Sequence, residues 1–153
     1  MKITIYTDGS SIGNPGPGGY GVVLMFGKHR KELSAGFRLT TNNRMELLAV
    51  IVALEALTKN DIPVEIYTDS KYVCDAIEKK WLWGWLKKGF AGKKNPDLWL
   101  RFLRIYKNFT DVKFNWVKGH VGIPENERCD VLATTAARGE KLLIDTEYEA
   151  IEK

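Results

Sequence analysis

The order of its patterned segments is the feature that most constrains the fold of this chain. Three runs with strand character come first, and helical and strand-like segments alternate after them. In chain order, we predict strands at 2–7, 20–26 and 32–38, a helix from about 41, a strand at 64–68, a helix from about 70, a helix after 96, a strand at 111–117 and a helix at 125–137. This order predicts an α/β fold in which a mixed five-stranded sheet, three antiparallel strands followed by alternating helix and strand, is flanked by helices.

Length and hydropathy restrict the chain to one ordinary domain. Its 153 residues are enough to bury a core, and no linker interrupts them. The longest apolar stretch, 47–57, is much shorter than the roughly 20 residues of a membrane span, and no secretory signal follows Met1. We therefore expect no membrane association and a cytoplasmic protein, in which Cys74 and Cys129 serve packing.

One four-residue pattern occurs twice, each time at the end of a predicted strand. Residues 5–8 and residues 66–69 both read Ile-Tyr-Thr-Asp. If the two strands are neighbours, Asp8 and Asp69 lie side by side at one edge of the sheet, where open α/β sheets bind ligands. Taken separately, Asp8 followed by glycine is also a common turn signal, and Asp69 followed by serine is typical of a helix cap.

Two adjacent carboxylates require a positive partner, because like charges raise each other's pKa. An all-oxygen group favours a hard divalent cation such as Mg²⁺, which points to phosphate chemistry. This argument connects Asp8 with Asp69 alone. By itself, Glu46 is an acidic residue in the first turn of a helix for which residues 41–43, Thr-Asn-Asn, supply capping side chains, and Asp130 belongs to a solvated helix face.

Residues 79–94 combine lysines with three tryptophans. Trp81 and Trp85 are four residues apart and share a helix face, while Lys87 and Lys88 can extend toward a nucleic-acid backbone. The same pattern is typical of an amphipathic helix that buries its tryptophans and leaves its lysines solvated, and both interpretations can hold together. The net charge of +4 and the pI near 9.0 permit a polyanionic partner without selecting one.

Five ordered motifs resemble those of the type 1 ribonuclease H family, from Ile5 to about Ala137. They are YTDGS at 6–10, GNPGPGGYG at 13–21, TNNRMEL at 41–47, TDS at 68–70, and WVKGH at 116–120 continuing to PENERCD at 124–130. The resemblance implies a ribonuclease H-like catalytic domain over 1–138 with a basic protrusion at about 79–94, and a C-terminal tail over 139–153. The implied reaction is hydrolysis of the RNA strand of an RNA/DNA hybrid, which leaves 5′-phosphate and 3′-hydroxyl ends.

The resemblance also implies roles for individual residues. Asp8, Glu46, Asp69 and Asp130 would bind two Mg²⁺ ions, with Mn²⁺ as a possible substitute, and His120 would transfer a proton or help the product leave. The residues that would contact the hybrid are Asn14, Thr41, Asn42, Asn43, Lys71, Trp81, Trp85, Lys87, Lys88 and Asn95. Relatives often carry other residues at the positions of Leu39, Lys71, Gly84 and Ile123, and none of these is a carboxylate position. The family is typically monomeric.

Two alternatives remain open at this point. The first is a binding module without catalysis, for which the basic tryptophan-rich segment suffices and the acidic positions are dispensable. The second is a DNA-acting nuclease of the same fold, as in integrases, transposases and junction resolvases, because fold alone does not fix the substrate. An NTPase is disfavoured, since the glycine-rich stretch at 13–19 lacks the Gly-x-x-x-x-Gly-Lys-Ser/Thr pattern.

Overall fold

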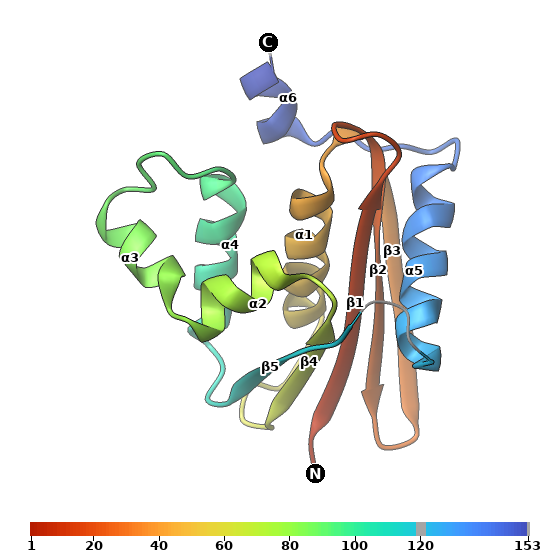
Figure 1. Ribbon diagram of the computed structural model, residues 1–153. Coiled ribbons are helices and arrows are strands. Elements are labelled where there is room, and N and C mark those ends of the chain that lie inside the picture. Colours follow the sequence, from red (N-terminus) through yellow and green to blue (C-terminus); the bar gives the residue numbers. More distant parts are fainter. Residues whose placement is uncertain (119–121, 153) are drawn as a thin grey trace.

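The computed structural model describes residues 1–118 and 122–152 and has the predicted α/β architecture (Figure 1). In chain order its elements are β1 (Ile3–Ser11), β2 (Gly16–Phe26), β3 (His29–Thr40), α1 (Asn42–Glu55), β4 (Val64–Thr68), α2 (Lys71–Glu78), α3 (Trp81–Lys87), α4 (Pro96–Tyr106), β5 (Val112–Trp116), α5 (Pro124–Ala137) and α6 (Thr146–Glu152). Within these described ranges, no helix is both long and apolar enough to cross a bilayer.

The sheet confirms the predicted mixture of strand directions. Its order is β3-β2-β1-β4-β5; the pairs among the first three strands are antiparallel, and β4 is parallel to both β1 and β5. Consecutive strands joined by short turns pair antiparallel, whereas a helical connection returns the chain in the same direction. The two strands that carry the repeated pattern are neighbours, which is the condition under which the sequence predicted that Asp8 and Asp69 lie close together.

Helices cover both faces of the sheet (Figure 1). The helix α5 lies on one face and contacts β1, β2 and β3, while α1 lies on the other, between the sheet and α4. Glycines allow α5 to lie very close to the sheet. A Cβ atom at Gly21 would collide with the carbonyl oxygen of Cys129, and one at Gly19 would lie 2.5 Å from that of Ala133. The close packing brings the first half of α5 toward the middle of β1.

Two predicted boundaries were wrong. The strand β1 does not end at Asp8, which pairs with Gly21 inside the antiparallel ladder, and β2 begins at Gly16, within the stretch expected to be a loop. Both errors arise because glycine commonly marks a turn, whereas here Gly9 lies in a strand where α1 approaches closely, and a Cβ atom at Gly16 would collide with the carbonyl oxygen of Ile12. The parallel pairing of β1 with β4 stops at Tyr6 and Tyr67, so Asp8 and Asp69 still follow neighbouring positions.

The segment after α5 is ordered against the sheet. The backbone N–H of Leu143 donates to the carbonyl oxygen of Gly36 at 2.8 Å, and the N–H of Arg38 donates to that of Leu143 at 2.9 Å. The predicted tail, 139–153, contains a helix, α6, that follows this attachment and that the sequence patterns do not predict. The C-terminal segment is thereby fixed beside β3.

Candidate active site

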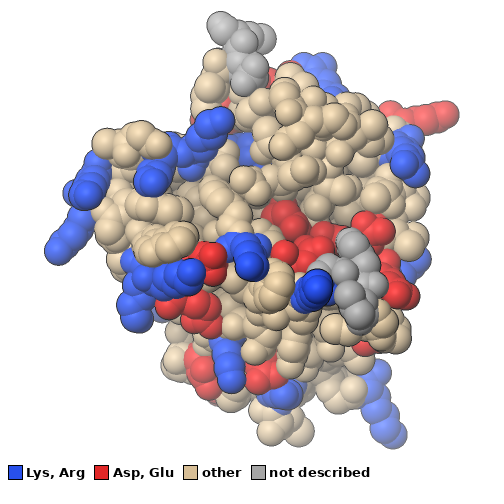
Figure 2. Space-filling view, viewed as in Figure 1, with Lys and Arg blue, Asp and Glu red and all other residues tan. Residues whose placement is uncertain are grey.

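Three carboxylates from separate parts of the chain meet at one end of the β1–β4 pair. Asp8 lies in β1, Glu46 in α1 and Asp69 directly after β4, and one oxygen of each lies within 4.8 Å of the others. Asp130 of α5 lines the same cleft, which has a volume of about 380 Å³. Figure 2 shows acidic side chains gathered on this face of the molecule, and lysine and arginine side chains toward the side where α3 lies.

The fold opposes ionisation of this cluster. Burial, followed by the charge of Asp69, raises the pKa of Asp8 from its ordinary 3.8 to about 8, although the backbone N–H of Gly9 donates to its Oδ1 at 2.9 Å. Burial and the charges of Asp8 and Asp69 raise the pKa of Glu46 well above its usual value. Asp8 is only 5% exposed and Glu46 only 9% exposed. A bound cation would reverse this penalty.

The donor set fits a hard divalent cation. All the converging ligand atoms are carboxylate oxygens, which Mg²⁺ and Mn²⁺ prefer. In addition, Oε1 of Glu46 is buried and accepts no hydrogen bond from any residue that the structure describes. Such an acceptor is costly unless a ligand satisfies it.

A cap and a glycine place Glu46 in the cluster. The hydroxyl of Thr41, one of the three predicted capping residues at 41–43, accepts a hydrogen bond from the backbone N–H of Arg44 at 3.2 Å and starts α1. Glu46 lies just after the first turn, not within it as expected. A Cβ atom at Gly9 would collide with the backbone at Glu46, so Gly9 allows α1 to approach β1. The sequence analysis missed this role; a glycine after an apolar alternating run is its only local signal.

Trp116 connects the last strand to the cluster. Its indole N–H donates to the backbone carbonyl of Asp69 at 3.0 Å, and the ammonium of Lys71 lies 4.7 Å from the centre of its ring. Lys71 also lines the carboxylate cleft, so this position carries a cation beside the acidic group.

A larger cleft of about 910 Å³ adjoins the carboxylate cleft. Asn43, Lys71 and Tyr72 line both. The predicted substrate-binding residues that line the larger cleft are Asn14, Thr41, Asn43, Lys71, Trp81, Trp85 and Asn95, and Asn42 lines the carboxylate cleft. Lys87 and Lys88 are exposed and are not among the described lining residues of either; Lys93 and Lys94 line the larger cleft instead. His120 lies outside the described residues.

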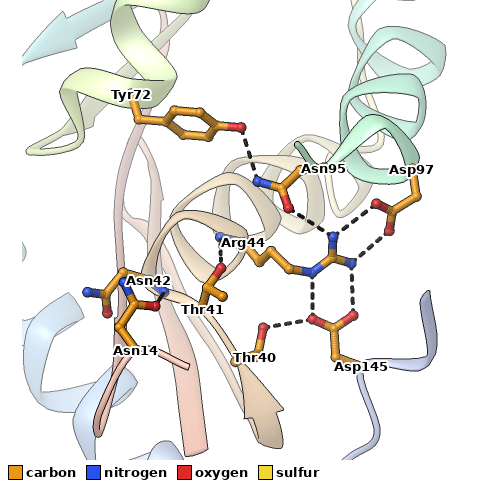
Figure 3. A network of polar contacts seen from close by, with 9 residues as sticks. All are labelled: Asn14, Thr40, Thr41, Asn42, Arg44, Tyr72, Asn95, Asp97 and Asp145. Carbon is orange, nitrogen blue, oxygen red and sulfur yellow. Dashed lines mark hydrogen bonds and ion pairs between the residues drawn. The ribbon is translucent and has the colours of Figure 1, made fainter. Parts of the chain in front are cut away.

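Several of the predicted substrate-binding side chains also hold the fold together (Figure 3). The Oδ1 of Asn14 accepts from the backbone N–H of Asn42 at 3.2 Å, and the Oδ1 of Asn42 accepts from the hydroxyl of Ser11 at 2.9 Å. The amide of Asn95 donates to the Tyr72 hydroxyl at 3.1 Å. These bonds fix the positions from which the carboxamides face the clefts.

A buried arginine joins three segments beneath the larger cleft (Figure 3). Arg44 is 1% exposed, and its guanidinium donates to both carboxylate oxygens of Asp97 and both of Asp145, as well as to Oδ1 of Asn95. The hydroxyl of Thr40 donates to Asp145 at 2.7 Å. The sequence analysis did not find this network. A positive charge within the apolar pattern of α1 is its only local sign.

Comparison with known proteins agrees with this geometry. The family model described as RNase H matches residues 1–138. The ribonuclease H of Desulforamulus reducens is 60% identical over 149 residues, covering 94% of this chain and 92% of that protein. The crystal structure of LC9-RNase H1, a type 1 RNase H with the type 2 active-site motif, has a TM-score of 0.80 at 32% identity and covers 97% of this chain and 79% of that one.

A second solved structure includes a nucleic acid. It is LC11-RNase H1 in complex with an RNA/DNA hybrid, with a TM-score of 0.66 at 31% identity over 89% of this chain and 96% of that one. The match to the family model over most of the chain, the high identity to the bacterial enzyme and the shared fold all agree. The chain therefore belongs to the ribonuclease H family, as a type 1 member.

Proposed function

We propose that this ribonuclease H hydrolyses the RNA strand of RNA/DNA hybrids with metal ions bound by Asp8, Glu46, Asp69 and Asp130. The convergence of three carboxylate oxygens within 4.8 Å, in a fold that raises the pKa of Asp8 and Glu46, is the observation that carries the proposal. Asp130 lines the same cleft and would complete the ligand set. Mg²⁺ is the proposed ion, with Mn²⁺ as a substitute.

The chain's own residues would divide the work of phosphodiester hydrolysis. When bound between the carboxylates, divalent cations supply an activated water and stabilise charge on the leaving oxygen. The four carboxylates hold these ions from rigid elements, and Lys71 places a positive charge at the edge of the cleft for a phosphate oxygen. His120 is proposed to transfer a proton or to assist product release. The products would carry 5′-phosphate and 3′-hydroxyl ends.

The larger cleft would hold the hybrid beside the carboxylates. The LC11-RNase H1 complex supports this, because it contains an RNA/DNA hybrid on a similar fold. Carboxamides can donate to and accept from a 2′-hydroxyl, and lysines and tryptophans bind phosphates and bases or sugars without sequence preference. The proposed contacts are Asn14, Thr41, Asn42, Asn43, Lys71, Trp81, Trp85, Lys87, Lys88 and Asn95.

Replacement of Asp69 by asparagine tests the catalytic assignment. We expect Asp69→Asn to lower the cleavage rate by at least about 100-fold, because it removes one charged metal ligand from a step that depends on transition-state charge stabilisation. Hybrid binding should remain within about threefold, since phosphate contacts dominate affinity. Asp61→Asn, at an exposed loop position, is the matched control and should cleave normally. Cleavage by Asp69→Asn at the rate of the control would contradict the assignment.

A panel of substrates separates the proposed function from a DNA-acting nuclease of the same fold. Labelled RNA/DNA hybrid, double-stranded RNA and double-stranded DNA are incubated with Mg²⁺, with Mn²⁺ and with chelator. We expect metal-dependent cleavage of the RNA strand of the hybrid. Preferential cleavage of double-stranded DNA would identify the other nuclease class, and binding without cleavage under every condition would identify a non-catalytic module.

We also propose a cytoplasmic monomer. Cys74 and Cys129 are buried free thiols, which suits a reducing compartment. Light scattering on the purified chain tests the assembly state, and a dimer mass would contradict it.

A further inference from the structure

The helix α6 lies at a wall of the larger cleft. Tyr148 and Ile151 line it together with Asn14, Trp81 and Lys93. In Figure 1, α6 lies at the top of the molecule, near the loop between β1 and β2 and on the side toward α3 and α4. The segment expected to be a tail therefore borders the proposed path of the nucleic acid.

Polar contacts, one buried and one exposed, fix this wall in place. Asp145, directly before α6, is 9% exposed and accepts hydrogen bonds from Nε and Nη2 of Arg44 at 2.7 and 2.9 Å (Figure 3). The carboxylate of Glu149, in α6, accepts hydrogen bonds from Nε and Nη2 of Arg38, in β3. Because the same Arg44 guanidinium bonds to Asp97 and Asn95 at the start of α4, the C-terminal wall and the α4 side of the cleft share one anchor.

The two sides of the cleft have complementary chemistry. The lysines Lys71, Lys93 and Lys94 line it and outnumber the one acidic residue among the described lining residues, Asp75, whereas α6 contributes the aromatic ring of Tyr148 and the aliphatic side chain of Ile151. Ile151 is 69% exposed, so its apolar surface is available to a ligand. A sugar–phosphate backbone fits between such walls, because its phosphates need cations and its sugars offer apolar faces.

We propose that α6 is part of the nucleic-acid-binding surface and that Tyr148 and Ile151 contact the backbone of the DNA strand. The choice of strand rests on the proposed function. The scissile RNA strand must reach the carboxylates, and the larger cleft adjoins that site through Asn43, Lys71 and Tyr72. The partner strand of the same duplex then occupies the larger cleft.

Introducing a negative or a positive charge at Ile151 tests this surface. In low salt we expect Ile151→Glu to raise the Kd for hybrid about fivefold and Ile151→Lys to lower it by a similar factor, because one charge acts on nearby phosphates. Both effects should largely vanish at about 0.5 M salt, where the screening length is only a few ångströms. The control variants are Ile144→Glu and Ile144→Lys, in the same segment, 51% exposed and not among the described lining residues; they should change Kd by less than about twofold.

Neutral methylphosphonate linkages placed one after another along the DNA strand identify the contacted strand. Where a neutral linkage replaces the contacted phosphate, the difference in Kd between Ile151→Glu and Ile151→Lys should shrink toward the difference between the two Ile144 variants. We expect this at one or more positions in the DNA strand. The fold of each variant is checked by thermal unfolding, and its midpoint temperature should equal that of the wild-type protein.

The possible failures are distinguishable. If wild-type protein cleaves the hybrid and the Ile151 variants bind as their Ile144 counterparts do, α6 is not part of the surface. If a difference exists and no DNA position reduces it, the strand assignment is wrong. Failure of the wild-type protein to cleave hybrid would instead overturn the proposed function.

Discussion

Replacing Asp8 with asparagine is expected to stabilise the metal-free protein at neutral pH. Burial and the charge of Asp69 raise the pKa of Asp8 from 3.8 to about 8. Below pH 3.8 the carboxyl is protonated in both folded and unfolded chains. Between pH 3.8 and about pH 8, Asp8 is deprotonated in the unfolded chain but stays protonated in the folded chain. The free energy of unfolding therefore falls as pH rises.

The size of the effect follows from the shift. One pKa unit corresponds to about 1.4 kcal/mol, and about 3 units separate 3.8 from neutral pH. Asp8 therefore costs the folded state at most about 4 kcal/mol at pH 7, and almost nothing at pH 4. Because Glu46 and Asp69 share the repulsion, and because the asparagine amide must itself find partners, we expect Asp8→Asn to gain about 2 kcal/mol at pH 7.

Urea unfolding followed by circular dichroism, in chelator at pH 4, 5.5, 7 and 8, measures this gain. It should grow from near zero at pH 4 to its full value at pH 8. Asp61→Asn, at an exposed loop position, should show no such trend. Added Mg²⁺ should stabilise wild-type protein more than Asp8→Asn, since only the former keeps all its ligands. A gain that is absent in chelator, or that does not rise with pH, would refute the electrostatic reasoning.

Other predictions concern packing and charge. In the same urea experiment, Asp145→Asn should lower the free energy of unfolding by about 3 kcal/mol, because the buried guanidinium of Arg44, in a residue only 1% exposed, loses a charged partner. Glu149→Gln should lower it by less than about 1 kcal/mol, because its partner Arg38 is exposed. Gly21→Ala should cost at least about 3 kcal/mol because its Cβ would collide with α5, and Gly84→Ala, whose Cβ meets no described atom within 4 Å inside α3, should gain up to about 1 kcal/mol. If Lys87 and Lys88 each neutralise a phosphate, alanine at either position should reduce the slope of log Kd for hybrid against log salt by about 0.9; an unchanged slope would remove that residue from the interface.

Local patterns account for most of the secondary structure. The alternation in β1 and β4, the capping residues at 41–43 and the apolar spacing in α1 and α2 involve residues near one another in the chain, so the sequence alone predicts them. The order of these elements then predicts the mixed sheet, because connection type sets strand direction. The strand boundaries at Asp8 and Gly16 are not predictable in this way, because only the tertiary structure shows that α1 approaches Gly9 and that the backbone of Ile12 approaches Gly16.

By itself, the sequence indicated that two aspartates at strand ends would meet if their strands were neighbours, and that their combined charge would then call for a cation. Motif resemblance added Glu46 and Asp130, and with them the family and its chemistry. Only the tertiary structure decided that Gly9 allows Glu46 to approach Asp8, that Arg44 joins Asp97 to Asp145, and that α6 borders the larger cleft. The physical reason is distance along the chain. Arg44 and Asp145 are 101 residues apart, and a bond between such residues leaves no periodic signal, because it depends on packing that the whole fold must first establish.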